Sequence, residues 1–174
     1  MFQRVAVFIF LFFLVLCQIS FFPAVLPGGI SPDLLLLLAV FLVTKEGFES
    51  SVSRIILAGL IYELMIFQPI GAKIFSLTIV AFLMGYFSKR FLVSQRNWRA
   101  SFLLILIFSG TLLDHFFLNG LVATSDYFKK SIPFSFALFM HAVIWKKVAL
   151  NLLFAPLAYY TFKKIDRHIG LLAR

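Results

Sequence analysis

Four ionisable side chains that could do chemistry lie inside apolar stretches of this sequence. Glu63 and Lys73 stand on either side of a tight turn, and Asp114 is followed directly by His115. A charged side chain in hydrocarbon costs roughly 2.5 to 3.5 kcal/mol on insertion scales unless it is paired, hydrated or near an interface. The pattern therefore indicates either a ligand or proton site joining Glu63 and Asp114, or helix-end polarity in which Glu63 and Lys73 satisfy each other. The second interpretation is favoured for that pair, because a lysine can extend to the interface without a ligand.

Asp114 is harder to explain as a polar residue at the end of a helix. It follows Ser101, the first residue of its apolar run, by 13 residues, which places it beyond mid-depth. We therefore expect Asp114 to face other helices. Neighbouring helical residues point about 100° apart, so Asp114 and His115 cannot both line one pocket, and neither has a metal-binding partner at helical spacing. No metal site is predicted.

The sequence does not favour an enzyme. It contains no H-E-x-x-H, G-x-S-x-G or phosphate-loop motif and no paired carboxylates at helical spacing. Ser109, Asp114 and His115 lie on one helix and cannot form a serine-hydrolase relay. No catalytic residue and no cofactor is predicted.

The elements that must position these residues are transmembrane helices. Apolar residues make up 62% of the chain, phenylalanine occurs 24 times and charged residues make up 13%, and the mean hydropathy is +1.02. This composition lies outside the range of soluble domains. The sequence predicts one integral membrane domain over residues 1–174, an all-α bundle of about six helices.

Apolar runs and turn residues set the expected helix bounds. The segment 125–143 is ambiguous: it is either an amphipathic helix at the membrane surface or, from near Ser135, part of a longer last helix. The first run lacks a small-x-small cleavage site and is interpreted as a retained helix. The predicted helices are 5–22, 32–44, 54–67, 71–88, 101–123 and 144–162.

Basic residues predict the orientation. A cytoplasmic loop is expected between the fourth and fifth helices, with Lys89, Arg90, Arg96 and Arg99. With both termini in the cytoplasm, eleven cations lie on the inner side and five on the outer side. The outer set is Lys73, Lys129, Lys130, Lys146 and Lys147. The formal charge of +9 is thus assigned to membrane orientation and not to nucleic-acid binding.

Short motifs carry a family resemblance over nearly the whole chain. They are Pro32-Asp33-Leu34-Leu35-Leu36, Gly59-Leu60-Ile61-Tyr62-Glu63, Pro69-Ile70-Gly71 and Gly85-Tyr86 before the basic loop. Ala58 and Gly59 would let a neighbouring helix approach closely, and Gly71 would permit a reversal of the chain. In order, spacing and length the sequence resembles the rod shape-determining protein MreD family.

The resemblance implies a non-enzymatic component of the bacterial inner membrane that serves lateral cell-wall elongation. It implies MreC as the main partner, with MreB, RodA and a penicillin-binding transpeptidase in the wider complex, and a fold similar to the substrate-binding subunits of energy-coupling-factor vitamin transporters. Contacts with membrane lipid are also expected. The alternative function is a small-molecule binding subunit of a transporter, in which Glu63 and Asp114 would be pocket residues.

Overall fold

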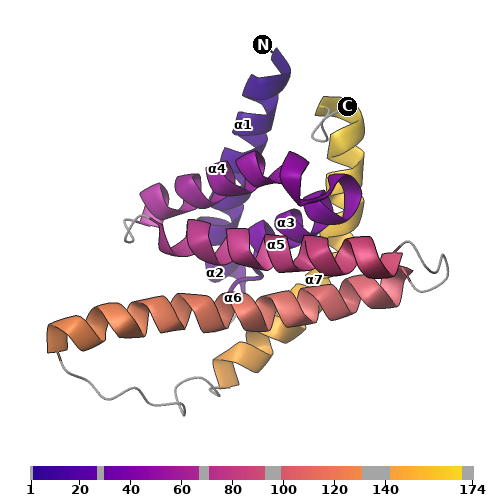
Figure 1. Cartoon of the computed structure of the whole chain (residues 1–174). Coiled ribbons are helices and arrows are strands. Elements are labelled where there is room, and N and C mark those ends of the chain that lie inside the picture. Colours follow the sequence, from indigo (N-terminus) through magenta and orange to yellow (C-terminus); the bar gives the residue numbers. More distant parts are fainter. Residues whose placement is uncertain (1, 27–29, 67–70, 93–98, 131–141, 170–174) are drawn as a thin grey trace.

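The computed structural model describes residues 2–26, 30–66, 71–92, 99–130 and 142–169. Within these residues the chain forms six helical rods and no strand, which confirms the all-α prediction. In Figure 1, α4 (Phe48–Ile66), α5 (Ala72–Leu92) and α6 (Arg99–Lys130) run side by side. The first rod, which begins with α1 (Phe2–Leu16), and α7 (Ala142–Ile169) run across them.

The core of the molecule is α3 (Leu34–Glu46), which packs against α1, α4, α5, α6 and α7. All residues from Leu35 to Val43 are buried. A helix that is apolar on every side is typical of a core position. Phe41 shows the packing, since its ring lies 5.3 Å from that of Tyr159 and 5.7 Å from that of Phe162.

The first rod is continuous but irregular. After α1 the backbone widens into a π-helical turn, Cys17–Phe21, and then continues as α2 (Phe22–Val25). The rod is longer than the predicted 5–22, because Pro23 occupies the first turn of α2, where its missing N–H is not needed. The π turn contains Gln18, the one buried residue of that turn. Such turns commonly mark functional or specialised positions in helices.

The second and third predicted helices differ from the structure at their starts. The second begins at Leu34 and not at Pro32, because Asp33 is its N-cap and accepts a hydrogen bond from the Leu36 N–H at 3.1 Å. The third begins at Phe48, six residues before the expected start, because Gly47 ends α3 with a φ of 87° and the chain turns directly into α4. The third helix is therefore not short.

The last two helices are also longer than predicted. The run 101–123 is part of α6, which extends to Lys130, and the run 144–162 is part of α7, which extends to Ile169. Of the ambiguous segment 125–143, residues up to Lys130 belong to α6, and 131–141 lie outside the described residues. Pro156 is accommodated inside α7.

Two motif glycines act as expected. A Cβ on Gly59 would lie 3.2 Å from the Ile74 Cα, so α4 and α5 approach closely at this position. Gly71 has a φ of 114°, a conformation that residues with a side chain rarely adopt, and it directly precedes α5. This conformation at Gly71 is consistent with the predicted reversal before the fourth helix, whereas Pro69 lies outside the described residues.

Candidate functional site

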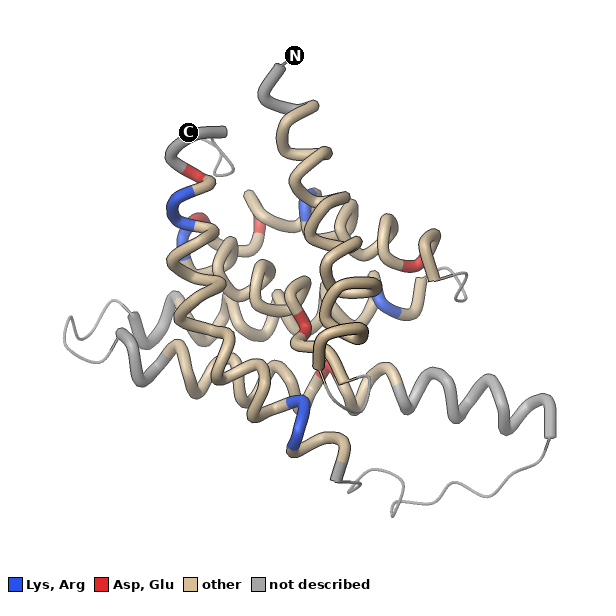
Figure 2. Tube along the Cα trace, turned by 180° about the vertical axis from the view of Figure 1, so that it is seen from behind, with Lys and Arg blue, Asp and Glu red and all other residues tan. Residues whose placement is uncertain are grey.

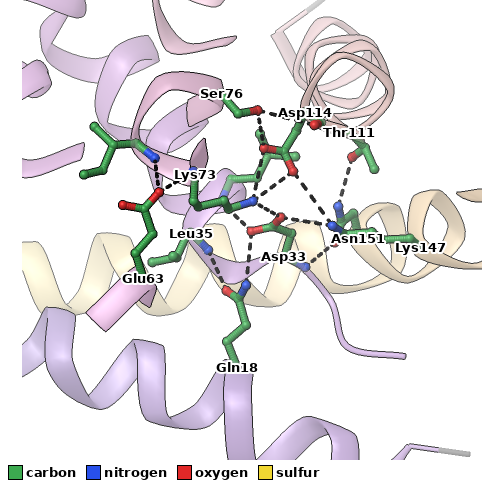
Figure 3. A network of polar contacts seen from close by, with 12 residues as sticks. Gln18, Asp33, Leu35, Glu63, Lys73, Ser76, Thr111, Asp114, Lys147 and Asn151 are labelled. Atoms are coloured by element: carbon green, nitrogen blue, oxygen red, sulfur yellow. Dashed lines mark hydrogen bonds and ion pairs between the residues drawn. The ribbon is translucent and has the colours of Figure 1, made fainter. Parts of the chain in front are cut away.

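Four charged side chains meet inside the helical bundle. We call Asp33, Lys73, Asp114 and Lys147 the charge cluster. They come from the start of α3, the start of α5, the middle of α6 and the first turns of α7, as Figure 3 shows. Asp33 and Asp114 are 1% exposed and Lys73 is 2% exposed. These groups are therefore removed from both water and lipid.

Lys73 holds the centre of the charge cluster. Its Nζ donates to Asp33 Oδ2 at 2.7 Å and to Asp114 Oδ2 at 2.9 Å and Oδ1 at 3.1 Å. The Ser76 hydroxyl, one turn further along α5, donates to Asp114 Oδ1 at 2.8 Å. A buried ion pair is tolerated when further hydrogen bonds satisfy its remaining lone pairs and protons. Lys73 and Ser76 together supply such bonds for Asp114.

Lys147 brings the second positive charge. Its Nζ lies 3.3 Å from Asp33 Oδ2 and 3.8 Å from Asp114 Oδ2. Unlike Lys73, this side chain is partly accessible, at 22% exposure. The cluster therefore contains two carboxylates and two ammonium groups, and their formal charges cancel.

Two amides connect the charge cluster to the backbone of α3. The Asp33 N–H donates to Asn151 Oδ1 at 2.6 Å, and the Asn151 amide donates to the Thr111 hydroxyl at 2.9 Å. Gln18, from the π turn, accepts from the Leu35 N–H at 3.1 Å and donates to Asp33 Oδ1 at 3.4 Å. The Asp33 and Leu35 N–H groups at the start of α3 thus receive partners from other helices, while the Leu36 N–H is capped by Asp33 itself.

Glu63 forms a second polar site beside the charge cluster. Its carboxylate accepts hydrogen bonds from the backbone N–H groups of Gly71 at 2.8 Å, Ile74 at 3.1 Å and Lys73. A carboxylate at a helix N-terminus is favourable, because it satisfies unpaired N–H groups and faces the positive end of the helix dipole. Glu63 is fully buried, so it caps α5 from inside the protein.

Both predicted arrangements of Glu63 need correction. The side chains of Glu63 and Lys73 do not pair: Glu63 binds the Lys73 backbone, while the Lys73 ammonium turns to the two aspartates. Lys73 is buried and does not extend to the interface as expected. Glu63 and Asp114 form no shared site in the described contacts either, since Lys73 stands between them. The expectation that Asp114 faces other helices is confirmed.

The other motif residues have structural positions. Pro32 is buried just before the N-cap of α3. Gly85 lies on α5, where a Cβ would be 3.0 Å from the Phe48 Cβ. Lys89 and Arg90 belong to α5, and Arg99 begins α6, so three of the four expected loop cations are helical. Arg96 lies outside the described residues.

Sequence reasoning assigned no role to Gln18, Asn151 and Thr111, and it counted Lys147 among the cations of the outer side, near the start of the helix predicted at 144–162. Each of these polar residues stands within or beside an apolar run. Polar side chains at such positions are costly in free energy without partners. This cost is the signal in the sequence that could have identified them as members of a buried polar site. What the sequence lacked was the spatial proximity, because the contacts of Asp33 with Asn151 and of Lys73 with Asp114 span 118 and 41 residues.

The contacts of this site join helices to one another. Each carboxylate of the charge cluster is held by ammonium groups, and three helices and the start of a fourth contribute side chains to it. Among the described residues, no three His, Cys, Asp or Glu side chains are grouped so that they could hold a metal ion. The arrangement therefore fixes how α3, α5, α6 and α7 pack against one another.

The length and apolar composition of the helices can be compared with the thickness of a membrane. Among the described residues, one stretch, Val5–Val25, is long and apolar enough to cross a membrane, and Ala72–Ser88 and Leu103–Leu118 are shorter apolar helices. The fold and the buried charges together define an all-α protein with apolar helices that are joined by an internal ionic cluster.

The family then follows from comparison. Residues 1–165 match the family of the rod shape-determining protein MreD, and the chain belongs to this family of non-enzymatic, multi-pass membrane proteins. No curated protein and no solved structure matches the chain. The likeness to energy-coupling-factor subunits therefore stays a prediction.

Proposed function

We propose that this protein is an inner-membrane component of the cell-elongation machinery that binds MreC and helps to organise peptidoglycan synthesis. Membership of the rod shape-determining family is the observation that carries the proposal. MreB, RodA and a penicillin-binding transpeptidase are its proposed associates in the wider complex. The protein would act by binding and positioning its partners within the membrane.

The outer face of α1 is the surface that best fits a partner's transmembrane helix. Large apolar side chains cover it: Ile9 is 60% exposed, Phe13 is 62% exposed and Phe8 is 47% exposed. In contrast, the charged side chains of Asp33, Lys73 and Asp114 pair with one another inside the bundle. Packing between apolar helix surfaces is a main source of helix association in membranes.

The arrangement of the chain supports an even number of membrane crossings. The first turns of α1 and the last turns of α7 lie toward the same end of the molecule, as seen from both sides in Figures 1 and 2. Pairing of Lys73 and Lys147 with the two aspartates of the charge cluster also removes two cations from the outer set. Both observations support a topology with the two termini in the cytoplasm.

The transporter alternative has less support. It required Glu63 and Asp114 to be ligand-binding residues in a pocket. Glu63 instead binds the backbone of α5, and Asp114 binds Lys73, Ser76 and Lys147. A ligand would have to displace these contacts.

The test is recovery of partners from mildly solubilised membranes. The double variant Phe8→Ala, Phe13→Ala alters the α1 face, and Phe82→Ala, at 54% exposure on α5, is the matched control. We expect the α1 variant to lose MreC recovery and rod shape at an unchanged protein level, while the control retains both. Equal MreC recovery from both variants would exclude the α1 face. Recovery of an ATP-driven coupling module in place of MreC would favour the transporter function.

A further inference from the structure

An apolar groove lies between α3, α6 and α7, apart from the charge cluster. Its volume is about 630 Å³, and its lining includes Leu37, Phe41, Leu104, Ile107, Ala155 and Tyr159. At about 30 Å³ per molecule, roughly twenty waters would fill this volume against side chains that offer few hydrogen bonds. An apolar occupant suits the groove better than water.

One end of the groove is bounded by a hydrogen bond between two of its helices. The hydrogen bond between Asn151 and Thr111 ties α7 to α6 just before the lining residues begin. From there α7 continues through Ala155 to Tyr159, while α6 runs back through Ile107 toward its first turn. The two helices therefore flank the groove in antiparallel directions.

The other end of the groove is basic. Lys45 follows Phe41 by one turn of α3, and its Nζ lies 5.8 Å from the centre of the Tyr159 ring. Lys163 follows Tyr159 by one turn of α7, and both lysines are exposed. The nearby Glu46 is bound by Arg54 at 2.5 Å, and Asp166 lies almost one turn beyond Lys163. Exposed cations thus stand where the apolar lining ends.

We propose that this groove binds an acyl chain of an anionic phospholipid, whose phosphate contacts Lys45 and Lys163. The apolar groove matches the acyl chain of such a molecule, and the two exposed lysines at its end match the phosphate. In the proposed topology this end faces the cytoplasmic leaflet, where anionic lipids attract basic residues. A partner's transmembrane helix fits less well, because its cytoplasmic flank would itself carry Lys or Arg. The inference does not depend on MreC binding.

A tryptophan in the groove would report the lipid directly. Leu104 lines the groove and is 45% exposed, so Leu104→Trp is introduced in the full chain after Trp98→Phe and Trp145→Phe. The protein is placed in phosphatidylcholine nanodiscs, and either brominated phosphatidylglycerol or brominated phosphatidylcholine is titrated in. We expect the anionic lipid to quench the fluorescence at a several-fold lower mole fraction.

Charge variants test which residues cause this preference. Lys45→Gln and Lys163→Gln should each reduce it, and together abolish it, with little change in quenching by brominated phosphatidylcholine. Lys146→Gln, which removes an exposed lysine near the opposite end of α7, should leave the preference unchanged. All three lysines are exposed, so these variants are expected to fold.

Two results would overturn the proposal. Equal quenching by both lipids in the protein that keeps Lys45 and Lys163 would show that the groove does not select the lipid headgroup. Absence of quenching by either lipid, with crosslinking of a residue at position 104 to a copurified protein, would show that a partner helix occupies the groove. Neither result would bear on whether MreC binds the α1 face, because that is measured by copurification.

Discussion

The charge cluster and the apolar groove share three helices, α3, α6 and α7, and lie about one or two turns apart along them. On α3, Asp33 belongs to the cluster and Leu37 to the groove; on α7, Asn151 contacts Asp33 and Ala155 lines the groove. In the cluster, side chains from different helices satisfy one another. In the groove, apolar side chains from the same helices surround an open volume. The difference separates the part of the molecule that fixes helix packing from a part that can receive an external molecule.

The largest effect should come from removing the central cation. Lys73→Met would leave Asp33 and Asp114 facing each other in a buried site with only Lys147 nearby. Breaking a buried pair by removing one partner typically costs about 3 to 5 kcal/mol, so we expect a loss of that size in the free energy of unfolding. Denaturation of the purified protein in mixed micelles, followed by circular dichroism, measures it.

Lys146→Met is the matched control for this variant, because it removes an exposed lysine of the same type. Its unfolding free energy should stay within about 0.5 kcal/mol of the unmodified protein. Similar values for Lys73→Met and Lys146→Met would mean that the cluster does not hold the helices together.

A smaller loss is expected at Glu63. Glu63→Ala removes the acceptor for three backbone N–H groups at the start of α5. Buried donors without a partner cost about 1 to 3 kcal/mol, and we expect a total near 2 to 3 kcal/mol because α5 can fray at this end. Hydrogen exchange should show the loss at residues 71–74. Glu63→Gln keeps one acceptor oxygen and should lose less; an equal loss would indicate that the negative charge, and not the hydrogen bonds, is required.

Asn151 lies between the two regions and tests their boundary. Asn151→Ala leaves the Asp33 N–H and the Thr111 hydroxyl without this partner, for an expected cost of about 1 to 2 kcal/mol. In a double-mutant cycle with Thr111→Val, the two effects should be less than additive, because they share one hydrogen bond. Strict additivity would show that the Asn151 contact with Thr111 contributes nothing.

The sequence predicts the helices better than their connections. Apolar runs located all six rods, and the cost of burying a charge identified Glu63, Lys73 and Asp114. Helix ends were less accurate, because the cap at Asp33 and the turn at Gly47 depend on backbone geometry. The pairing of Lys73 with Asp114 could not be predicted, because the choice between extending to the interface and turning inward depends on which helices are neighbours.

The smallest effect on the free energy of unfolding should come from a substitution in the apolar groove. Leu104→Ala removes a half-exposed side chain from the groove wall, where no tightly packed cavity is created, so the free energy of unfolding should change by less than about 0.5 kcal/mol. The same substitution should weaken retention of phosphatidylglycerol through detergent purification, measured by lipid mass spectrometry. Leu153→Ala, at 71% exposure on α7, is the control and should retain the lipid. A stability loss at position 104 comparable to that at Asn151 would mean that the groove wall is part of the packed core, and the separation between a binding region and a packing region would fail.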